Sequence, residues 1–214
     1  SYRTDVHAIE CLQNNPNIEL AMIENDIPDL SCNKLLVDNI GGAKQAVEYL
    51  IANGHRKIAY ISGNPNKKVT MDRLNGYVQT MQAHGLEIKD EYIHHVSENI
   101  LGYQCMEDIL KSKEKPTAVF CWDDGVASYA VRACIDEGVS VPGEMSIMGF
   151  DNRRIFPQGY RGPDITTIEQ PLYQIGKESI ELLSKRLSDP NSVEPIRKIY
   201  PTRVIEKETV GNIG

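Results

Sequence analysis

The stretch KLLVDNIGGAKQAVEYLIANGHRKIAYISG, residues 34–63, decides the fold class. It opens on a short apolar run, Lys34–Val37, and closes on a second one, Ile58–Ser62. Between them, apolar residues recur at i, i+3, i+4, i+7 and i+8 from Ala43, which is one face of an amphipathic helix. Gly54 follows as a helix stop. The stretch therefore predicts a strand, a helix and a strand, the unit from which parallel sheets are built.

The same alternation continues on both sides of this stretch. Further strands are predicted at Ile18–Ile23, Tyr92–Val96, Thr117–Cys121 and Met145–Gly149, and helices at Gly42–Asn53, Met71–His84, Leu101–Lys111, Asp124–Glu137 and Pro171–Leu187. Asn152–Pro163 is predicted to be a loop, and Lys198–Glu206 to hold one or two final strands. The strands are nearly continuous apolar runs, so we expect an α/β fold whose parallel sheet is covered on both faces.

Composition narrows the class of protein. The 214 residues carry a formal net charge of -7, which disfavours direct contact with a nucleic-acid backbone. No run of 18 apolar residues and no basic segment followed by an apolar run is present, so we expect neither a membrane span nor a signal peptide. The five cysteines are scattered, which favours buried, reduced thiols in a cytoplasmic protein.

Polar residues follow the predicted strands. They are Glu24-Asn25-Asp26, Asp38-Asn39, Asn64, Ser97-Glu98, Asp123-Asp124 and Asp151-Asn152. Ligands of open α/β sheets bind at the carboxyl ends of the strands. Carboxylates and amides there suit the vicinal hydroxyls of a sugar.

Asp123 and Asp124 could be the paired carboxylates of a glycosidase. Adjacent residues, however, do not normally reach a bond from opposite sides, as an acid and a base must. Asp124 precedes Gly125 and an alanine-containing helical run, so we expect it to cap the helix, while Asp123 contacts a ligand. No residue is assigned a catalytic role.

The histidines and glycines give no cofactor or metal site. His94 and His95 lie on a strand and point to opposite faces, and His55 stands at a helix end that favours a cation or a hydrogen-bond donor. Gly41 and Gly42 fit either an anion cradle or a tight turn before a helix. Dinucleotide, Walker, hydrolase and zinc-protease motifs are absent from the sequence, so no cofactor is expected.

Several segments, taken in order and spacing, resemble a known family. They are VDNIGGA (37–43) with AVEYLI (46–51), NGHRKIAYISG (53–63), RLNGY (73–77), PTAVFCWDD (116–124), VPGEMSIMGFDN (141–152) and ITTIEQP (165–171). Together they are similar to the effector domain of LacI/GalR-type transcriptional regulators, over about Ile18 to Val204.

The resemblance implies a periplasmic-binding-protein-like fold, in which two parallel-sheet lobes are joined by crossover strands and hold an effector between them. It implies that Arg73 and Asp151 clamp the ligand and that Asp123 contacts it. Further ligand-lining positions fall on Glu24, Ser97 and Gln170. Alanine at Arg73 or Asp151 is expected to abolish effector binding and to leave the fold intact.

The same resemblance divides the chain. Residues 1–40 are expected to be the remainder of the N-terminal lobe, 41–151 the C-terminal lobe, 152–190 a return to the N-terminal lobe with its long helix, and 191–214 the final strands and tail. The DNA-binding helix-turn-helix and about half of the N-terminal lobe are missing, so we expect a portion of a longer regulator, and we expect that regulator to be a repressor.

The expected function is effector sensing by a cytoplasmic, homodimeric regulator that is not an enzyme. Its expected partners are a small-molecule effector, which we expect to be a neutral sugar, and operator DNA, which the missing helix-turn-helix would bind. No membrane partner is expected. A transport-associated periplasmic sugar-binding protein stays open as an alternative, as does a sugar-processing hydrolase.

Overall fold

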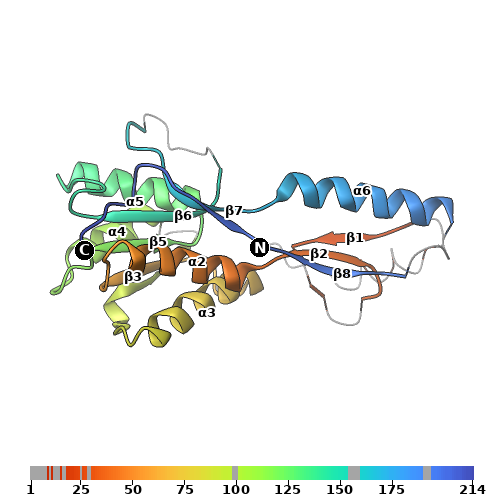
Figure 1. Cartoon of the computed structure of the whole chain (residues 1–214), viewed down its shortest axis with the longest axis horizontal. Coiled ribbons are helices and arrows are strands. Elements are labelled where there is room, and N and C mark those ends of the chain that lie inside the picture. Colours follow the sequence, from red (N-terminus) through yellow and green to blue (C-terminus); the bar gives the residue numbers. More distant parts are fainter. Residues whose placement is uncertain are drawn as a thin grey trace. The chain divides into compact units, whose positions relative to one another are not determined.

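The computed structural model describes residues 9, 11, 15, 18–24, 26–27, 30–97, 101–153, 160–189 and 194–214. The chain forms two compact units (Figure 1). The small unit consists of Ser1–Asp38 and Pro171–Pro201, and the large unit of Asn39–Gln170 and Thr202–Gly214.

The large unit is built on a six-stranded sheet in the order β4-β3-β5-β6-β7-β9. Its strands are β3 (Ile58–Ser62), β4 (Ile93–His95), β5 (Ala118–Cys121), β6 (Ser146–Asp151), β7 (Thr166–Glu169) and β9 (Arg203–Ile205). Neighbours from β4 to β7 pair in parallel, and β9 pairs antiparallel with β7. The carboxyl ends of five strands therefore meet at one edge.

Helices cover both faces of this sheet (Figure 1). They are α2 (Asn39–Ala52), α3 (Lys68–Ala83), α4 (Gly102–Leu110) and α5 (Asp124–Asp136). Alternate residues of β3 point to opposite faces, so Tyr60 packs with α2 and α3, and Ile61 packs with α4 and α5. In the described part of the chain, no helix has the length and apolar content needed to cross a membrane.

The small unit is a three-stranded parallel sheet with one described long helix (Figure 1). Its elements are β1 (Ala21–Ile23), β2 (Asn33–Val37), β8 (Arg197–Tyr200) and α6 (Leu172–Ser188). Ile175 and Leu182 of α6 pack on Leu35, Val37 and Tyr200 of the sheet. Apolar side chains three to four residues apart give the helix its buried face.

The predicted α/β class with parallel sheets is confirmed. The predicted strands at 34–37 and 58–62 flank one helix but belong to different sheets. β7 was missed as a strand, and its pairing with β6 keeps residues 152–170 in the large unit, whereas the sequence-based division gives 152–190 to the other lobe. β8 joins the small unit and β9 the large one, so the final strands also separate.

Four cysteines are buried, free thiols: Cys32, Cys105, Cys121 and Cys134. Cys11 is exposed. Burial raises the pKa of the Cys105 thiol to about 11, so it stays protonated at neutral pH. The prediction of reduced, buried thiols is confirmed for these four residues.

Glycines end three helices, as predicted. Gly54, Gly85 and Gly138 have φ of 93°, 64° and 71°, a region that side chains with a Cβ rarely adopt. Gly54 is also crowded, because a Cβ there would lie 2.6 Å from the backbone nitrogen of Gly214. Gly85 has no atom within 4 Å of that position.

Gly54 and Gly85 therefore form a matched pair for mutation. Gly85→Ala is expected to lower the free energy of unfolding by about 1 kcal/mol, because alanine disfavours the left-handed backbone conformation there. Gly54→Ala is expected to cost about 1–3 kcal/mol more, because backbone at Gly214 must move. Urea denaturation of both variants measures the difference, and equal losses would contradict the packing of Gly214 against this turn.

Candidate ligand-binding site

Arg73 lies on α3, and its side chain is only 3% exposed. The guanidinium donates from Nε to Asn39 Oδ1 at 2.9 Å and from Nη2 to Asp151 Oδ1 at 3.1 Å. Its Nη1 donates to the backbone oxygen of Trp122. One side chain thus joins α2, the end of β6 and the segment after β5. A buried guanidinium with an ion-pair partner and two further acceptors is held in one position.

Two aromatic rings fix the plane of this guanidinium. Its Cζ lies 3.6 Å from the ring centre of Phe150 and 5.5 Å from that of Trp122. Gly42 makes room for Phe150, since a Cβ there would lie 2.7 Å from the ring. Because α2 begins at Asn39, Gly42 lies inside the helix, and the tight-turn interpretation of these glycines is wrong.

Asp151 ends β6 in a strained conformation, with φ of 105°, and Asn152 follows with φ of 53°. Gln170 Nε2 donates to the same Oδ1 that accepts from Arg73. Asp151 Oδ2 accepts no hydrogen bond from the described residues. Two of the five N–H donors of Arg73 also remain unused there. The pair therefore keeps an acceptor and donors for a polar molecule.

The turn after β6 is held by a further polar network. Asn152 Nδ2 donates to Glu169 Oε1 at 2.8 Å, and Lys207 Nζ donates to Asn152 Oδ1 at 2.9 Å. Arg203 forms an ion pair with Glu169 at 2.5 Å. These hydrogen bonds connect the turn to β7 and to the segment beyond β9, and they stabilise its strained backbone.

Asp123, and not Asp124, caps α5. Its Oδ1 accepts from the backbone N–H of Val126 at 2.7 Å, so the predicted assignment of the cap to Asp124 is wrong by one residue. Burial raises the pKa of the Asp123 carboxyl, and the charge of Asp151 raises it further, while Arg73 lowers it. Asp123 thus shares the electrostatic environment of the Arg73–Asp151 pair.

Asp124 is buried in the large unit, with 1% exposure. Its Oδ1 accepts from Thr167 Oγ1 at 2.6 Å, and its Oδ2 accepts from the backbone N–H of Arg153 at 2.6 Å. Burial raises the pKa of this carboxyl to about 7, and the nearby charge of Asp151 contributes to the rise. Asp124 therefore has a role within the fold that its sequence position did not reveal.

The other two predicted site residues are Ser97 and Glu24. Ser97 is exposed and follows β4 at the same carboxyl edge of the sheet. Glu24 belongs to the small unit, has φ of 60°, and accepts through Oε1 from the backbone N–H of Val37 at 2.9 Å. The structure thus joins Arg73, Asp151 and Gln170 directly and places Glu24 in the other unit.

Sequence reasoning missed three parts of the cluster: Asn39, Phe150 and Trp122. Asn39 was among the strand-end residues, but its partner could not be read from the sequence. Trp122 is the only tryptophan, and its indole N–H is buried without a hydrogen-bond partner among the described residues. The presence of the only tryptophan directly after a predicted strand was a signal in the sequence that this position belongs to the site.

Of the two roles predicted for His55 at a helix end, a cation or a hydrogen-bond donor, the ring has the second, because it donates to the backbone oxygen of Gly211. Its ring is buried, with Nδ1 at 2.9 Å from Thr117 Oγ1 and Nε2 at 3.2 Å from the backbone oxygen of Gly211. Burial lowers the pKa of the imidazole, so the ring is neutral at pH 7. In the described segments, no three His, Cys, Asp or Glu side chains gather as a metal site.

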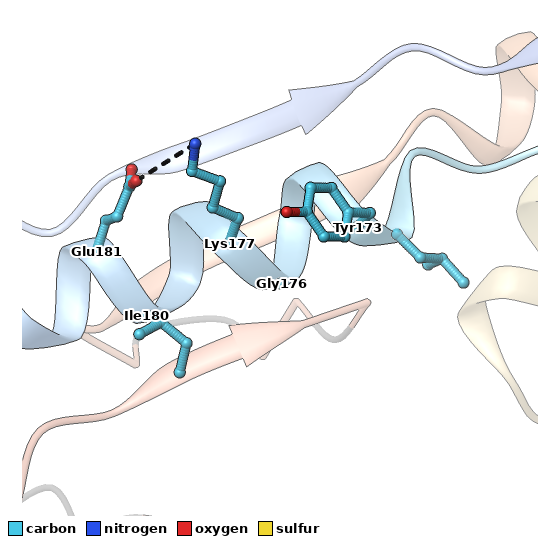
Figure 2. A pocket seen from close by; sticks show the side chains of 6 residues that line it. Tyr173, Gly176, Lys177, Ile180 and Glu181 are labelled. Carbon is cyan, nitrogen blue, oxygen red and sulfur yellow. Dashed lines mark ion pairs between the residues drawn. The ribbon is translucent and has the colours of Figure 1, made fainter.

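A separate groove of about 510 Å³ lies on α6 in the small unit (Figure 2). It is lined by Leu172, Tyr173, Gly176, Lys177, Ile180 and Glu181. Lys177 and Glu181 form an ion pair at 3.9 Å beside the apolar surface. None of the predicted site residues lines this groove, so it does not mark the Arg73 cluster.

Comparison with known proteins gives a consistent family. Residues 47–210 match the family described as periplasmic binding protein-like domain. The HTH-type transcriptional repressor PurR of Histophilus somni (strain 129Pt) is 37% identical over 210 residues, which cover 94% of this chain and 62% of that protein. The chain thus spans about three-fifths of the length of this protein and of the other PurR repressors that it matches.

Solved structures agree with the sequence match. The transcriptional regulator CelR, in complex with cellobiose, is 28% identical and superposes with a TM-score of 0.75 over 86% of this chain and 55% of that one. A regulatory protein of the LacI family from Chloroflexus aggregans is 27% identical, with a TM-score of 0.74 over 87% of this chain and 66% of that one.

Proposed function

This chain belongs to the periplasmic-binding-protein-like domain family, as an effector-binding domain of the LacI/GalR type, and from that premise we propose that it senses a small molecule for a transcriptional repressor. The relatives are named repressors, which favours this function over the transport-associated binding protein. We take the small and large units as the two lobes of such a domain.

The observation that carries the proposal is the pair formed by the buried Arg73 and the largely buried Asp151. Its members are pinned by Asn39 and Gln170, yet they keep an acceptor oxygen and N–H donors. Such preorganised polar groups are what a specific binding site needs. We propose Arg73, Asp151, Gln170 and Asp123 as ligand contacts of the large lobe, and Ser97 and Glu24 as further contacts that the family resemblance implies.

A neutral, hydroxyl-rich effector fits the charges of this site. Asp151 already neutralises Arg73 at 3.1 Å, and burial disfavours the charged form of Asp123, as the raised pKa of its carboxyl indicates. No unbalanced cation remains among these groups to attract a phosphate or a carboxylate. Carboxylate oxygens and guanidinium N–H groups bind vicinal hydroxyls well. Cellobiose, the ligand of CelR, is the natural first probe.

The carboxylates of the site serve structure and recognition, which favours a binding protein over an enzyme. Asp123 caps α5, Asp124 is buried among fixed hydrogen bonds, and Asp151 is paired with Arg73. Glycoside hydrolysis requires an acid and a base on opposite sides of a substrate bond, whereas each of these carboxylates already accepts a hydrogen bond within the fold.

The proposed regulator is a cytoplasmic homodimer that binds operator DNA through a helix-turn-helix outside this sequence. The effector acts by binding one arrangement of the lobes more tightly than the other, and this differential affinity sets the coupling to DNA binding. A ligand with equal affinity for both arrangements would have no effect.

Calorimetric titration of the chain with cellobiose, glucose, ribose, glucose 6-phosphate and adenine tests the proposal. We expect a neutral sugar to bind, and at about 100 times its dissociation constant to stabilise the fold by about 2.7 kcal/mol. Asp151→Ala is expected to weaken that binding by at least about 100-fold, because it removes a charged acceptor.

Asp136→Ala is the matched control, since the exposed Asp136 at the end of α5 pairs with Arg132 and Tyr103 and, in the described part of the chain, with none of the proposed ligand contacts. It should bind the sugar as the wild type does. Binding of glucose 6-phosphate or adenine alone, or undiminished sugar affinity in Asp151→Ala, would overturn the neutral-sugar site.

A further inference from the structure

The backbone that follows β6 is fastened to α5 by a short relay of hydrogen bonds. The N–H of Asn152 donates to Thr167 Oγ1 at 3.3 Å, and this hydroxyl donates to Asp124 Oδ1 at 2.6 Å. The N–H of Arg153 donates to the other oxygen, Asp124 Oδ2, at 2.6 Å. One buried carboxylate therefore holds two consecutive amides of the strained turn that begins at Asp151.

We propose that Asp124 is a positioning residue for effector binding. Its hydrogen bonds hold the turn Asp151–Arg153 and thereby fix the position of the Asp151 carboxylate. This inference rests on the proposed function, because Asp151 is its ligand contact. A positive φ at two successive residues other than glycine persists only where surrounding contacts impose it. Asp124 and Thr167 supply those contacts from α5 and β7.

Gly149 shows that the fold reserves space for this carboxylate. A Cβ at Gly149 would lie 2.1 Å from Asp124 Oδ1, too close for any side chain. Gly149 stands on β6 two residues before Asp151, so the strand that carries the proposed ligand contact also admits the group that positions it. Gly149→Ala therefore displaces the carboxylate without altering a clamp group chemically.

The clamp requires an ionised Asp124. Both oxygens accept hydrogen bonds, and a proton on either would turn an acceptor into a donor facing another donor. The titratable groups around it are Asp151 on β6, Lys207 beyond β9 and the thiol of Cys121 on β5, which stays neutral because burial raises its pKa. Asp151 raises the pKa of Asp124 and Lys207 lowers it. Burial brings that pKa to about 7, so the clamp should weaken below neutral pH.

The test compares Thr167→Val, which removes the relaying hydroxyl, with Thr167→Ser, which keeps it. Amide hydrogen exchange at Asn152 and Arg153 is followed by NMR in the unliganded chain, with the amide of Tyr77 in the same unit as the reference for global opening. We expect protection at Asn152 to fall up to about tenfold relative to Tyr77 in Thr167→Val, and to stay at the wild-type level in Thr167→Ser. Unchanged relative protection in Thr167→Val would overturn the clamp.

Gly149→Ala should lower relative protection at Arg153, and wild-type protection there should fall as the pH drops through about 7. If both stay constant, Asp124 does not hold the turn. Titration with cellobiose then separates the clamp from the proposed function. If the wild type binds no sugar, the sugar site is refuted, and the hydrogen-exchange result alone decides whether Asp124 holds the turn. If the wild type binds sugar and Thr167→Val binds it equally well, the positioning role is refuted.

Discussion

Arg73→Ala is expected to lower the free energy of unfolding by about 3–5 kcal/mol. The change leaves the largely buried carboxylate of Asp151 without its cation, and it removes the donor that Asn39 Oδ1 and the backbone oxygen of Trp122 share. Uncompensated buried charge and unsatisfied acceptors are each costly. Urea denaturation of the variant and the wild type measures the loss.

Lys68→Ala on the same helix is the matched control. Lys68 pairs with Asp72 at 2.6 Å, but its side chain is 64% exposed, so the expected loss is below about 1 kcal/mol. A comparable loss in both variants would contradict the structural role of Arg73. The expected result also differs from the sequence-based view that alanine at Arg73 abolishes binding and leaves the fold intact, because the guanidinium is a buried link between three elements.

Arg73 and Asp151 could be predicted as site residues from the sequence, because each belongs to a motif that resembles the family, RLNGY (73–77) and VPGEMSIMGFDN (141–152). Ligands of open α/β sheets bind at the carboxyl ends of the strands, and Asp151 ends such a strand. Arg73 lies on α3, a helix that covers one face of the same sheet. The partners that hold the pair were not accessible. Which carbonyl or amide faces a guanidinium depends on three-dimensional packing, as with Asn39 and the backbone of Trp122.

β7 was missed because its buried positions are polar. Thr166 and Thr167 are fully buried, so the strand does not read as an apolar run. Their hydroxyls are used instead: Thr166 Oγ1 accepts from the backbone N–H of Lys207 at 3.0 Å, and Thr167 Oγ1 donates to Asp124. A strand that buries satisfied hydroxyls is invisible to hydrophobic periodicity.

The cap of α5 shows a second limit of sequence reading. Asp123 and Asp124 are equally good caps by residue type, and a helix boundary predicted from periodicity is uncertain by one or two residues. The structure separates their roles, since Asp123 caps the helix and Asp124 turns inward toward β7. The inward position is what brings Asp124 into contact with the turn after Asp151.

Asp124 is expected to make stability depend on pH between about 4 and about 7. The pKa of its carboxyl is about 7 in the folded chain, and its ordinary value in the unfolded chain is 3.8. Within this window the folded chain holds a proton that the unfolded chain has lost, so the free energy of unfolding falls as the pH rises. At about 1.4 kcal/mol for each pKa unit, the contribution present below pH 4 and lost above pH 7 is about 4 kcal/mol.

Asp124→Asn isolates this effect, because the other titrating groups are common to both proteins. The difference in stability between the wild type and the variant should shift by about 4 kcal/mol against the wild type between pH 4 and pH 8, as measured by urea denaturation. A constant difference would mean that the carboxyl stays ionised in the fold. The ionised carboxyl thus costs stability at neutral pH. It accepts directly from the amide of Arg153, and it accepts from the Thr167 hydroxyl to which the amide of Asn152 donates. Such a trade-off is typical of residues kept for a binding site.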